Sequence, residues 1–282
     1  MKRYVVDGGT AVLTGAASGS GRATARELSA RGSNLVLLDR DAAGLEAVAA
    51  ELRAARRDRQ VTTYVVDLSD RDSALAVAET IRGSHPHLPL LVNNAGVALS
   101  GRLDQVSLDD IDWVLSINLH AVILMTHTLL PSLVSTQGSH VVNVSSLFGI
   151  IGPPGQAAYV ASKFAVRGFS DSLRQELAPH GVGVTTVHPG GIATNIATSA
   201  RVGGGVASDE QASHRDVAAK LLTIDPAIAA RKIVDGVERR KPRVLIGFSA
   251  YALDVVARVA PGSYGVLLRK YDELLDQRAR AT

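Results

Sequence analysis

Tyr159 and Lys163 are two side chains that can move a proton, and they stand four residues apart. On a helix this spacing places both on one face. A free phenol has a pKa near 10 and is a poor acid or base at neutral pH, but a nearby ammonium stabilises the phenolate and lowers that pKa. The pair therefore indicates acid/base chemistry at a hydroxyl or carbonyl. The pair alone is weak evidence for such chemistry, because a tyrosine and a lysine at this spacing also occur by chance in many helices.

Two further segments strengthen this interpretation. Residues 141–144 form a short apolar run that ends in Ser145 and Ser146, thirteen residues before Tyr159. A serine hydroxyl there can polarise a carbonyl that Tyr159 protonates. Residues 93–96, Asn-Asn-Ala-Gly, close another apolar run in the same manner.

A glycine-rich segment at residues 14–21 is suited to bind a pyrophosphate. It follows an apolar run and precedes a helical pattern, and its spacing is G-x-x-x-G-x-G, not the usual G-x-G-x-x-G. Glycines allow close backbone approach, and the following helix N-terminus favours negative charge. A purely structural turn is the alternative. The residues expected at the phosphates are Gly15, Ser18, Gly19, Ser20 and Gly21.

Asp39 and Arg40 bear on the choice of cofactor. A carboxylate at the end of the second strand accepts hydrogen bonds from ribose hydroxyls and repels a 2′-phosphate, whereas a guanidinium can hold that phosphate. We predict NAD, with NADP as the less favoured cofactor. The alternative role for Asp39 is a helix cap, because it precedes a helix that starts near Asp41.

Alternating short apolar runs and helical patterns indicate how these residues are positioned. Strands are expected at 11–14, 35–38, 62–66, 90–92, 141–144, 182–187 and 244–246, all read as buried. Helices are expected at 22–30, 45–55, 108–130 and 154–178, with Pro131 ending or kinking the third of these. The pattern predicts an α/β fold: a doubly wound, Rossmann-type, parallel seven-stranded sheet with helices on both faces.

One domain over residues 1–282 is expected from the chain length. Residues 197–222 are expected to form a substrate lid and mix small, polar and charged residues; the charged ones and histidine are Arg201, Asp209, Glu210, His214 and Arg215. Residues 248–282 are expected to form a C-terminal helical extension, with two helices separated by Pro261 and Gly262. On the second of these an apolar stripe is expected to pack on the core or on another subunit; it comprises Tyr264, Leu267, Leu268, Tyr271, Leu274 and Leu275.

With these motifs assembled, the chain resembles the short-chain dehydrogenase/reductase family in its compact, single-domain branch. The motifs that carry the resemblance are residues 14–21, Asp67-Leu68, residues 93–96, Asn118, Ser146, Tyr159 with Lys163, and residues 189–194. Residues 145–149 and 163–169 look especially like actinobacterial members of unassigned substrate. Ser20 departs from the family pattern, which has an aliphatic residue there.

The resemblance implies a role for each matched residue. Tyr159 would be the general acid or base, Lys163 would lower its pKa and hold the nicotinamide ribose, Ser146 would orient the carbonyl or hydroxyl, and Asn118 would anchor a proton-relay water. Further cofactor contacts would come from Asp67, Leu68, Asn93, Ala95, Gly96, Pro189, Gly190, Ile192 and Thr194.

Several kinds of function are disfavoured by composition. The chain has no cysteine, which excludes disulfides, thiolate catalysis and cysteine-bound metal. None of His85, His87, His140 and His188 has metal-ligand spacing, so we expect structural or solvated roles and no metal. The basic residues 239–243 are expected to form a solvated helix end with no nucleic-acid role. No apolar stretch reaches the roughly 20 residues of a membrane span, and no secretory signal is expected.

The expected function is an NAD(P)-dependent oxidoreductase that interconverts a secondary alcohol and a ketone. The apolar residues Leu147, Phe148, Ile150 and Ile151 favour a hydrophobic substrate. A non-catalytic NAD-binding regulator, or a lyase or epimerase on the same scaffold, are the alternatives. Apolar residues around the helices at 108–130 and 154–178 predict a homo-oligomer, most simply a tetramer, and a cytoplasmic location fits.

Overall fold

The computed structural model of this chain describes residues 3–208, 211 and 221–266. Seven parallel strands form one sheet in the order β3-β2-β1-β4-β6-β7-β9. The order reverses between β1 and β4, which is the switch point where ligands bind in doubly wound sheets. The predicted fold class is confirmed. The strands are β1 (Thr10–Thr14), β2 (Asn34–Asp39), β3 (Val61–Val65), β4 (Leu90–Asn93), β6 (His140–Val144), β7 (Gly183–Pro189) and β9 (Arg243–Ile246).

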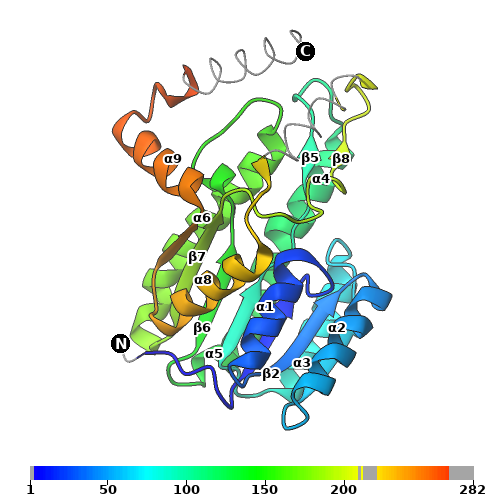
Figure 1. Cartoon of the computed structure of the whole chain (residues 1–282), viewed down its shortest axis with the longest axis vertical. Helices are drawn as coiled ribbons and strands as arrows, with labels where there is room; N and C mark the ends of the chain where they lie inside the picture. The colour runs from blue at the N-terminus through cyan, green and yellow to red at the C-terminus, as the bar shows by residue number, and fades with distance from the viewer. Residues whose placement is uncertain (1–2, 209–210, 212–220, 267–282) are drawn as a thin grey trace.

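Helices cover both faces of the sheet, and each face has its own apolar core. On one face lie α1 (Gly19–Ala30), α2 (Ala42–Ala55) and α8 (Pro226–Glu238), whose leucines, valines and isoleucines pack on β1, β2 and β9. Figure 1 shows α1 and α8 in front of the sheet. On the other face lie α3 (Arg71–Ser84), α5 (Ala121–Val134) and α6 (Ala157–Leu177). Such double coverage explains why most strands are apolar along their whole length.

The helix predicted at 108–130 is longer and less regular than expected. It comprises α4 (Leu108–Leu115), a π-helical turn (Ser116–His120) and α5, and a capping box between Ser107 and Asp110 fixes its start. Pro131 lies inside α5, so the expectation that it ends the helix is wrong. Proline removes only one backbone hydrogen bond here, within the last turn, and Ser135 N still donates to Pro131 O at 3.0 Å.

Residues Leu108–Val134 form one helix that is long and apolar enough, by length and composition, to cross a membrane. Half of its most apolar window is buried inside the protein. Met125, Leu129 and Leu133 are fully buried in the core against the sheet. Packing on the sheet therefore accounts for the hydropathy of this helix.

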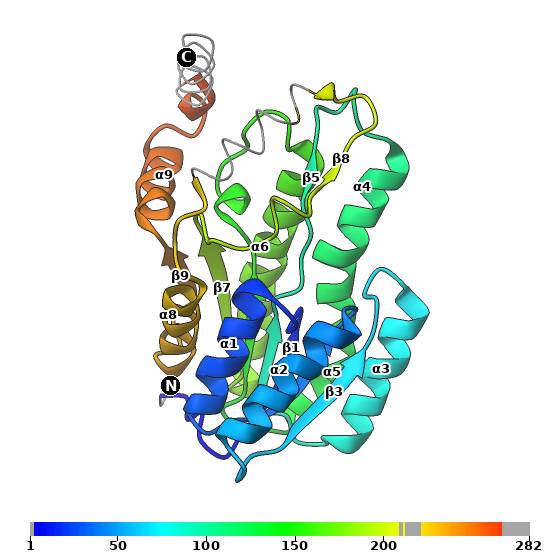
Figure 2. The same ribbon diagram turned by 45° about the vertical axis from the view of Figure 1, so that its right-hand side comes forward.

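Two elements differ from the sequence-based expectation. β3 is an edge strand of the sheet and not a buried one, because it pairs only with β2 within the described residues, and Val65 is 58% exposed. A second, two-stranded sheet joins β5 (Leu99–Ser100) to β8 (Arg201–Val202). Figures 1 and 2 both show it beside one end of α4. Strands of two residues have no periodicity that a sequence pattern can reveal.

The predicted lid and C-terminal extension are described in part. Residues 197–208 lead into and out of β8, while Asp209, Glu210, His214 and Arg215 lie outside the described residues. The first helix within the expected extension is α9 (Phe248–Val259). Of the predicted apolar stripe, Tyr264 is described and accepts a hydrogen bond from Gly152 N at 3.2 Å; its other five members lie outside the described residues.

Candidate active site

Tyr159, Lys163 and Ser146 meet at the carboxyl ends of the central strands. Tyr159 and Lys163 lie on consecutive turns of α6 and are both buried, at 8% and 3% exposure. Lys163 Nζ is 5.7 Å from the centroid of the Tyr159 ring and donates to Val144 O, the last residue of β6, at 3.2 Å. Ser146 lies two residues beyond Val144. The sequence-predicted set is thus brought together by one helix and one strand end.

Burial dominates the proton affinities of this site. It raises the pKa of the Tyr159 phenol, while a hydrogen bond with the Ser146 side chain lowers it. Burial also lowers the pKa of Lys163 to about 8. The pKa of Tyr159 is raised overall, because desolvation of the phenolate outweighs the hydrogen bond with Ser146. Ser146 is therefore the side chain that favours the phenolate in this arrangement.

Asn118 lies in the π-helical turn and is fully buried. Its Oδ1 accepts from Val97 N at 2.9 Å, and its Nδ2 donates to Val97 O at 3.0 Å and to Ser162 Oγ at 3.1 Å. Single π-turns are frequent at functional sites because they redirect one side chain. This one lets Asn118 join the segment after β4 to α6. A Cβ at Gly96 would lie 3.2 Å from Lys163 Nζ and 3.3 Å from Asn118 Oδ1, so Gly96 faces both groups.

The glycine loop is held by a residue that the sequence did not single out. Asn94 Nδ2 donates to Thr14 O at 3.0 Å and to Gly15 O at 3.1 Å, and its Oδ1 accepts from Ser20 Oγ at 3.0 Å. Ser20 thus replaces aliphatic packing with a hydrogen bond. The available signal was an amide side chain one residue past the strand end, beside the glycine loop in a parallel sheet. Thr14 Oγ1 completes the brace by accepting from Asn94 N and Ala95 N, both at 3.1 Å.

The loop fits a dinucleotide pyrophosphate. A Cβ at Gly21 would lie 1.8 Å from Gly15 O, and one at Gly19 would lie 3.0 Å from the Thr194 methyl, so only glycine permits this close approach. Within the described residues no side chain caps the start of α1 and its first turn has no acidic residue. Its backbone N–H groups are therefore available to an anion. Thr194 brings the segment after β7 against the same loop.

Asp39 ends β2 and accepts two backbone hydrogen bonds, from Ala17 N at 2.9 Å and Asp41 N at 3.1 Å. The cap of α2 is instead Asp41, which accepts from Gly44 N at 3.0 Å. The alternative role of Asp39 as that cap is therefore wrong. Asp39 is partly exposed and Arg40 is exposed at the same strand end.

The remaining predicted cofactor contacts lie at three places in the fold. Asp67 follows β3 and accepts from Ser69 N at 2.9 Å, with Leu68 buried beside it. The side chain of Asn93 is buried and donates to Thr126 Oγ1 and Asn143 Oδ1, so it serves the sheet interior. Backbone bonds shape the turn after β7 at Pro189, Gly190, Ile192 and Thr194: Gly190 N donates to Ile246 O, and Thr194 N to Ile192 O.

Two histidines are structural components of the sheet. His140 is fully buried, and its Nε2 lies 2.7 Å from Thr185 Oγ1. His188 is also fully buried, and its Nδ1 lies 3.0 Å from Ser146 O. Burial lowers the pKa of His140 to about 3 and that of His188 to about 4. Among the described residues no cluster of histidine and acidic side chains could hold a metal ion.

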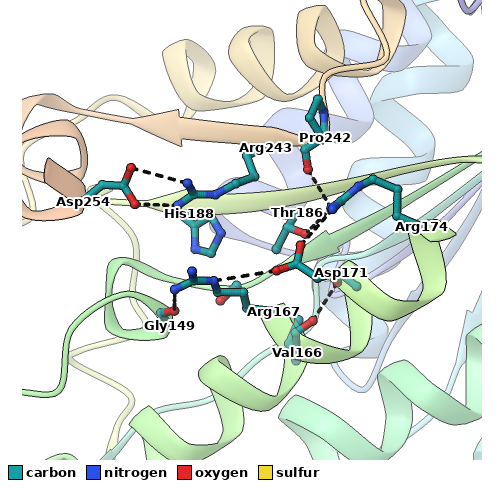
Figure 3. Close-up of polar contacts among 12 residues, drawn as sticks. Gly149, Val166, Arg167, Asp171, Arg174, Thr186, His188, Pro242, Arg243 and Asp254 are labelled. Carbon is teal, nitrogen blue, oxygen red and sulfur yellow. Dashed lines mark hydrogen bonds and ion pairs between the residues drawn. The ribbon is translucent and has the colours of Figure 1, made fainter. Parts of the chain in front are cut away.

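The basic residues 239–243, expected to form a solvated helix end, include two arginines that make contacts within the protein. Arg240 donates to the carbonyl oxygens of Gly138 and Ser139, and Arg243 pairs with Asp254 at 2.7 Å. Figure 3 shows the Arg243–Asp254 pair next to His188. Two of these basic residues are therefore not simply solvated: Arg240 contacts the residues just before β6, and Arg243 connects β9 to α9.

Comparison with known proteins agrees with this geometry. The family model for short chain dehydrogenases matches residues 9–203. The oxidoreductase SadH of Mycobacterium tuberculosis is 41% identical over 261 residues, covering 92% of this chain and 93% of SadH. The dehydrogenase/reductase SDR family member 7B of Bos taurus is 33% identical over 273 residues, which cover 94% of this chain and 81% of the bovine protein. The chain belongs to the short-chain dehydrogenase/reductase family.

Solved structures place the chain in the same family. A short-chain dehydrogenase/reductase of Burkholderia phymatum in complex with NAD has a TM-score of 0.81 at 27% identity, covering 94% of this chain and 96% of that one. A short-chain dehydrogenase of Sphingobium yanoikuyae in complex with NADPH has a TM-score of 0.74 at 27% identity, with 95% of each chain covered. The chain is therefore an oxidoreductase of a family that uses nicotinamide cofactors. The expected family and the expected likeness to its actinobacterial members are confirmed.

Proposed function

We propose that this protein interconverts a secondary alcohol and a ketone, with NAD as hydride carrier and Tyr159 as the acid/base group. The observation that carries the proposal is the convergence of Ser146, Tyr159 and Lys163 at the strand ends next to the glycine loop. An intact set of this kind argues against a purely regulatory NAD-binding role.

The proton chemistry follows from the three side chains. In reduction the Tyr159 hydroxyl would donate its proton to the carbonyl oxygen, and in oxidation the phenolate would remove the alcohol proton. Ser146 would hydrogen-bond the same substrate oxygen and keep it next to the phenol. Lys163 would hold positive charge beside the developing phenolate. The nicotinamide, when bound, supplies or accepts the hydride.

The cofactor would be held by groups already arranged for it. The glycine loop and the first turn of α1 would receive the pyrophosphate, and Asp39 would accept the adenosine ribose hydroxyls. The solved relatives include proteins bound to NAD and proteins bound to NADP or NADPH. Asp39 supports NAD as the preferred cofactor, and Arg40 is the group that would serve NADP.

The substrate is proposed to be hydrophobic. Phe148 is half-buried, and its ring stands edge-on to Tyr159 with centroids 6.1 Å apart, so an apolar wall adjoins the phenol. Leu147, also half-buried, precedes it. Ile150 and Ile151, at 4% and 2% exposure, belong to the core and do not form that wall. This narrows the expected apolar surface to Leu147 and Phe148.

We further propose a single domain with the lid at 197–222 and the C-terminal extension at 248–282. Because the family commonly assembles, a homotetramer is proposed, and the cytoplasm is proposed as its location.

Purified protein assayed with NAD and with NADP against a panel of secondary alcohols and ketones tests the function. We expect stoichiometric change of NAD for each alcohol oxidised. Product formation without net change in cofactor would instead favour a lyase or epimerase. Cofactor binding with no turnover of any compound would favour the regulatory alternative.

A further inference from the structure

His188 is a buried histidine next to the proposed site that has no part in the proton transfer described above. It lies on β7, one residue before Pro189, and its side chain is completely enclosed. Its Nδ1 is 3.0 Å from the carbonyl oxygen of Ser146. The same carbonyl accepts a hydrogen bond from Gly149 N, also at 3.0 Å. Ser146 O is therefore held by two donors, one local and one from the neighbouring strand.

The tautomer of His188 follows from these surroundings. The pKa of His188 is lowered to about 4, mainly by burial and also by the guanidinium groups of Arg243 and Arg167, whereas the bond to Ser146 and the charge of Asp254 oppose that shift. Figure 3 shows His188 among these arginines. The imidazole is therefore neutral at physiological pH. Since a carbonyl oxygen only accepts hydrogen bonds, the single proton must be on Nδ1.

Packing alone does not explain why a histidine occupies this position, because its second ring nitrogen lacks a hydrogen bond within the described part of the chain. Nε2 is buried and has no hydrogen-bond partner among the described residues. An unsatisfied buried nitrogen is unfavourable, and an apolar side chain would avoid it. A requirement for the Nδ1 donor accounts for a histidine at this position.

Ser146 needs a fixed carbonyl because its hydroxyl direction depends on its backbone. Ser146 is extended, with φ −160° and ψ 168°, and directly precedes the 3-10 turn at Leu147–Gly149. Its Oγ accepts from Phe148 N at 3.1 Å. With that interaction made, the hydroxyl proton remains for the Tyr159 oxygen, the partner that the phenol's environment indicates. A tilt of the Ser146 peptide would move Oγ away from that oxygen.

We propose that His188 is a positioning residue: its Nδ1–H holds the Ser146 carbonyl and thereby directs the Ser146 hydroxyl at Tyr159 and the substrate oxygen. This inference rests on the proposed function of Ser146 and Tyr159. His188 would then support the proton transfer indirectly, in addition to its packing in the sheet.

Three variants at two positions separate this role from a structural one. His188→Asn keeps an N–H donor near the Nδ1 position, His188→Leu removes it, and His140→Leu is the matched control. His140 is equally buried and makes one ring hydrogen bond, but it lies at the start of β6, away from the site. We expect His188→Leu to lower kcat roughly 10- to 100-fold with unchanged NAD affinity, as misplacing a reacting group does. His188→Asn should restore most of kcat, and His140→Leu should lower Tm with kcat unchanged.

A double-mutant cycle with Ser146→Ala gives the sharpest test. If His188 acts through Ser146, His188→Leu costs no further kcat in the Ser146→Ala background. His188→Leu should also raise the apparent pKa of the oxidation rate, as Ser146→Ala does, since both remove a bond that favours the phenolate. Three outcomes would each overturn the proposal. The first is a double variant whose loss of kcat is the product of the losses in the two single variants. The others are wild-type kcat in His188→Leu and no recovery of kcat in His188→Asn.

Failure of the proposed function gives a different result. In that case wild-type protein turns over no alcohol or ketone with either cofactor, and crystal structures then decide the role of His188. We expect Ser146 O and Oγ to shift in His188→Leu and to keep their places in His188→Asn. An unmoved Ser146 in the leucine variant would overturn the positioning role whatever the reaction.

Discussion

The Asp39 carboxylate accepts hydrogen bonds from Ala17 N in the glycine loop and from Asp41 N. In the proposed function it also accepts hydrogen bonds from the ribose hydroxyls of NAD. We expect Asp39→Ala to raise the KM for NAD and to raise the ratio of kcat/KM with NADP to that with NAD, because a charge that repels the 2′-phosphate is lost and Arg40 remains.

Asp41→Ala is the matched control for this substitution. It removes the cap of α2 two residues away, at a cost of roughly 1 kcal/mol in stability, without touching the strand end. Its NADP-to-NAD ratio should equal that of the wild type. Steady-state kinetics with both cofactors give the answer, and a wild-type preference for NADP would show that Arg40 outweighs Asp39.

The buried histidines make the stability of the fold depend on pH. His140 and His188 have pKa values of about 3 and about 4, below the ordinary 6.5, so the unfolded chain binds more protons. Their stabilising effect is complete above pH 6.5 and is lost as the pH falls toward the folded values. Each should lower the free energy of unfolding by about 1.4 kcal/mol per pH unit in that window.

His140→Gln isolates one of these contributions. Thr185 Oγ1 donates to Lys241 O, so His140 Nε2 must donate to Thr185, and a glutamine amide can do the same without titrating. Urea unfolding at a series of pH values should show a shallower slope between pH 6 and 4.5 in the variant. Equal slopes would mean that His140 does not titrate on unfolding.

At the scale of elements, β8 connects the described part of the proposed lid to the loop after β4. Arg201 N donates to Ala98 O at 3.0 Å, and the Arg201 guanidinium lies 3.9 Å above the ring of Trp113 and 3.2 Å from Asp110 Oδ1. Trp113 is the single tryptophan of the chain, so its fluorescence reports on this contact.

We expect Arg201→Ala to increase acrylamide quenching of Trp113 and to raise the KM of the organic substrate more than the KM of NAD. The guanidinium covers one face of the indole, and its loss frees both the ring and the strand. Arg102→Ala is a suitable control, since Arg102 pairs with Asp104 in the same region. Unchanged quenching in Arg201→Ala would show that the stack does not persist in solution.

The elements also show what could be predicted from the sequence. The seven strands and the set of Ser146, Tyr159 and Lys163 follow from apolar runs, fixed spacing and the family motifs. Helix α3 is not among the predicted helices, although Asp70 caps it and Ala74, Ala78 and Ile81 have helical spacing. The π-turn that carries Asn118 and the pairing of β5 with β8 depend on tertiary contacts, which a sequence pattern does not reveal. The brace made by Asn94 was missed for the same reason: its partners Thr14 and Ser20 lie more than seventy residues away along the chain.

For the whole molecule we expect a homotetramer. The face formed by α4, α5 and α6 leaves apolar side chains in solvent: Leu108 is 77% exposed, Ile123 39% and Phe164 37%. An exposed apolar surface of this kind often marks an association site, and homo-oligomers close by symmetry. Light scattering at micromolar concentration should give about four times the chain mass of 29.5 kDa. A mass near that of one chain would contradict any assembly. A mass near twice that value would show a dimer and contradict the tetramer.

The central claim is that Tyr159 moves the proton while the nicotinamide moves the hydride. Tyr159→Phe removes one hydroxyl from a buried ring and leaves the glycine loop intact. Steady-state turnover and NAD affinity, measured together on the folded variant, test the claim most directly. We expect kcat to fall roughly 10²- to 10⁴-fold with NAD affinity unchanged. Wild-type turnover in Tyr159→Phe would contradict the account and remove Tyr159 from the mechanism.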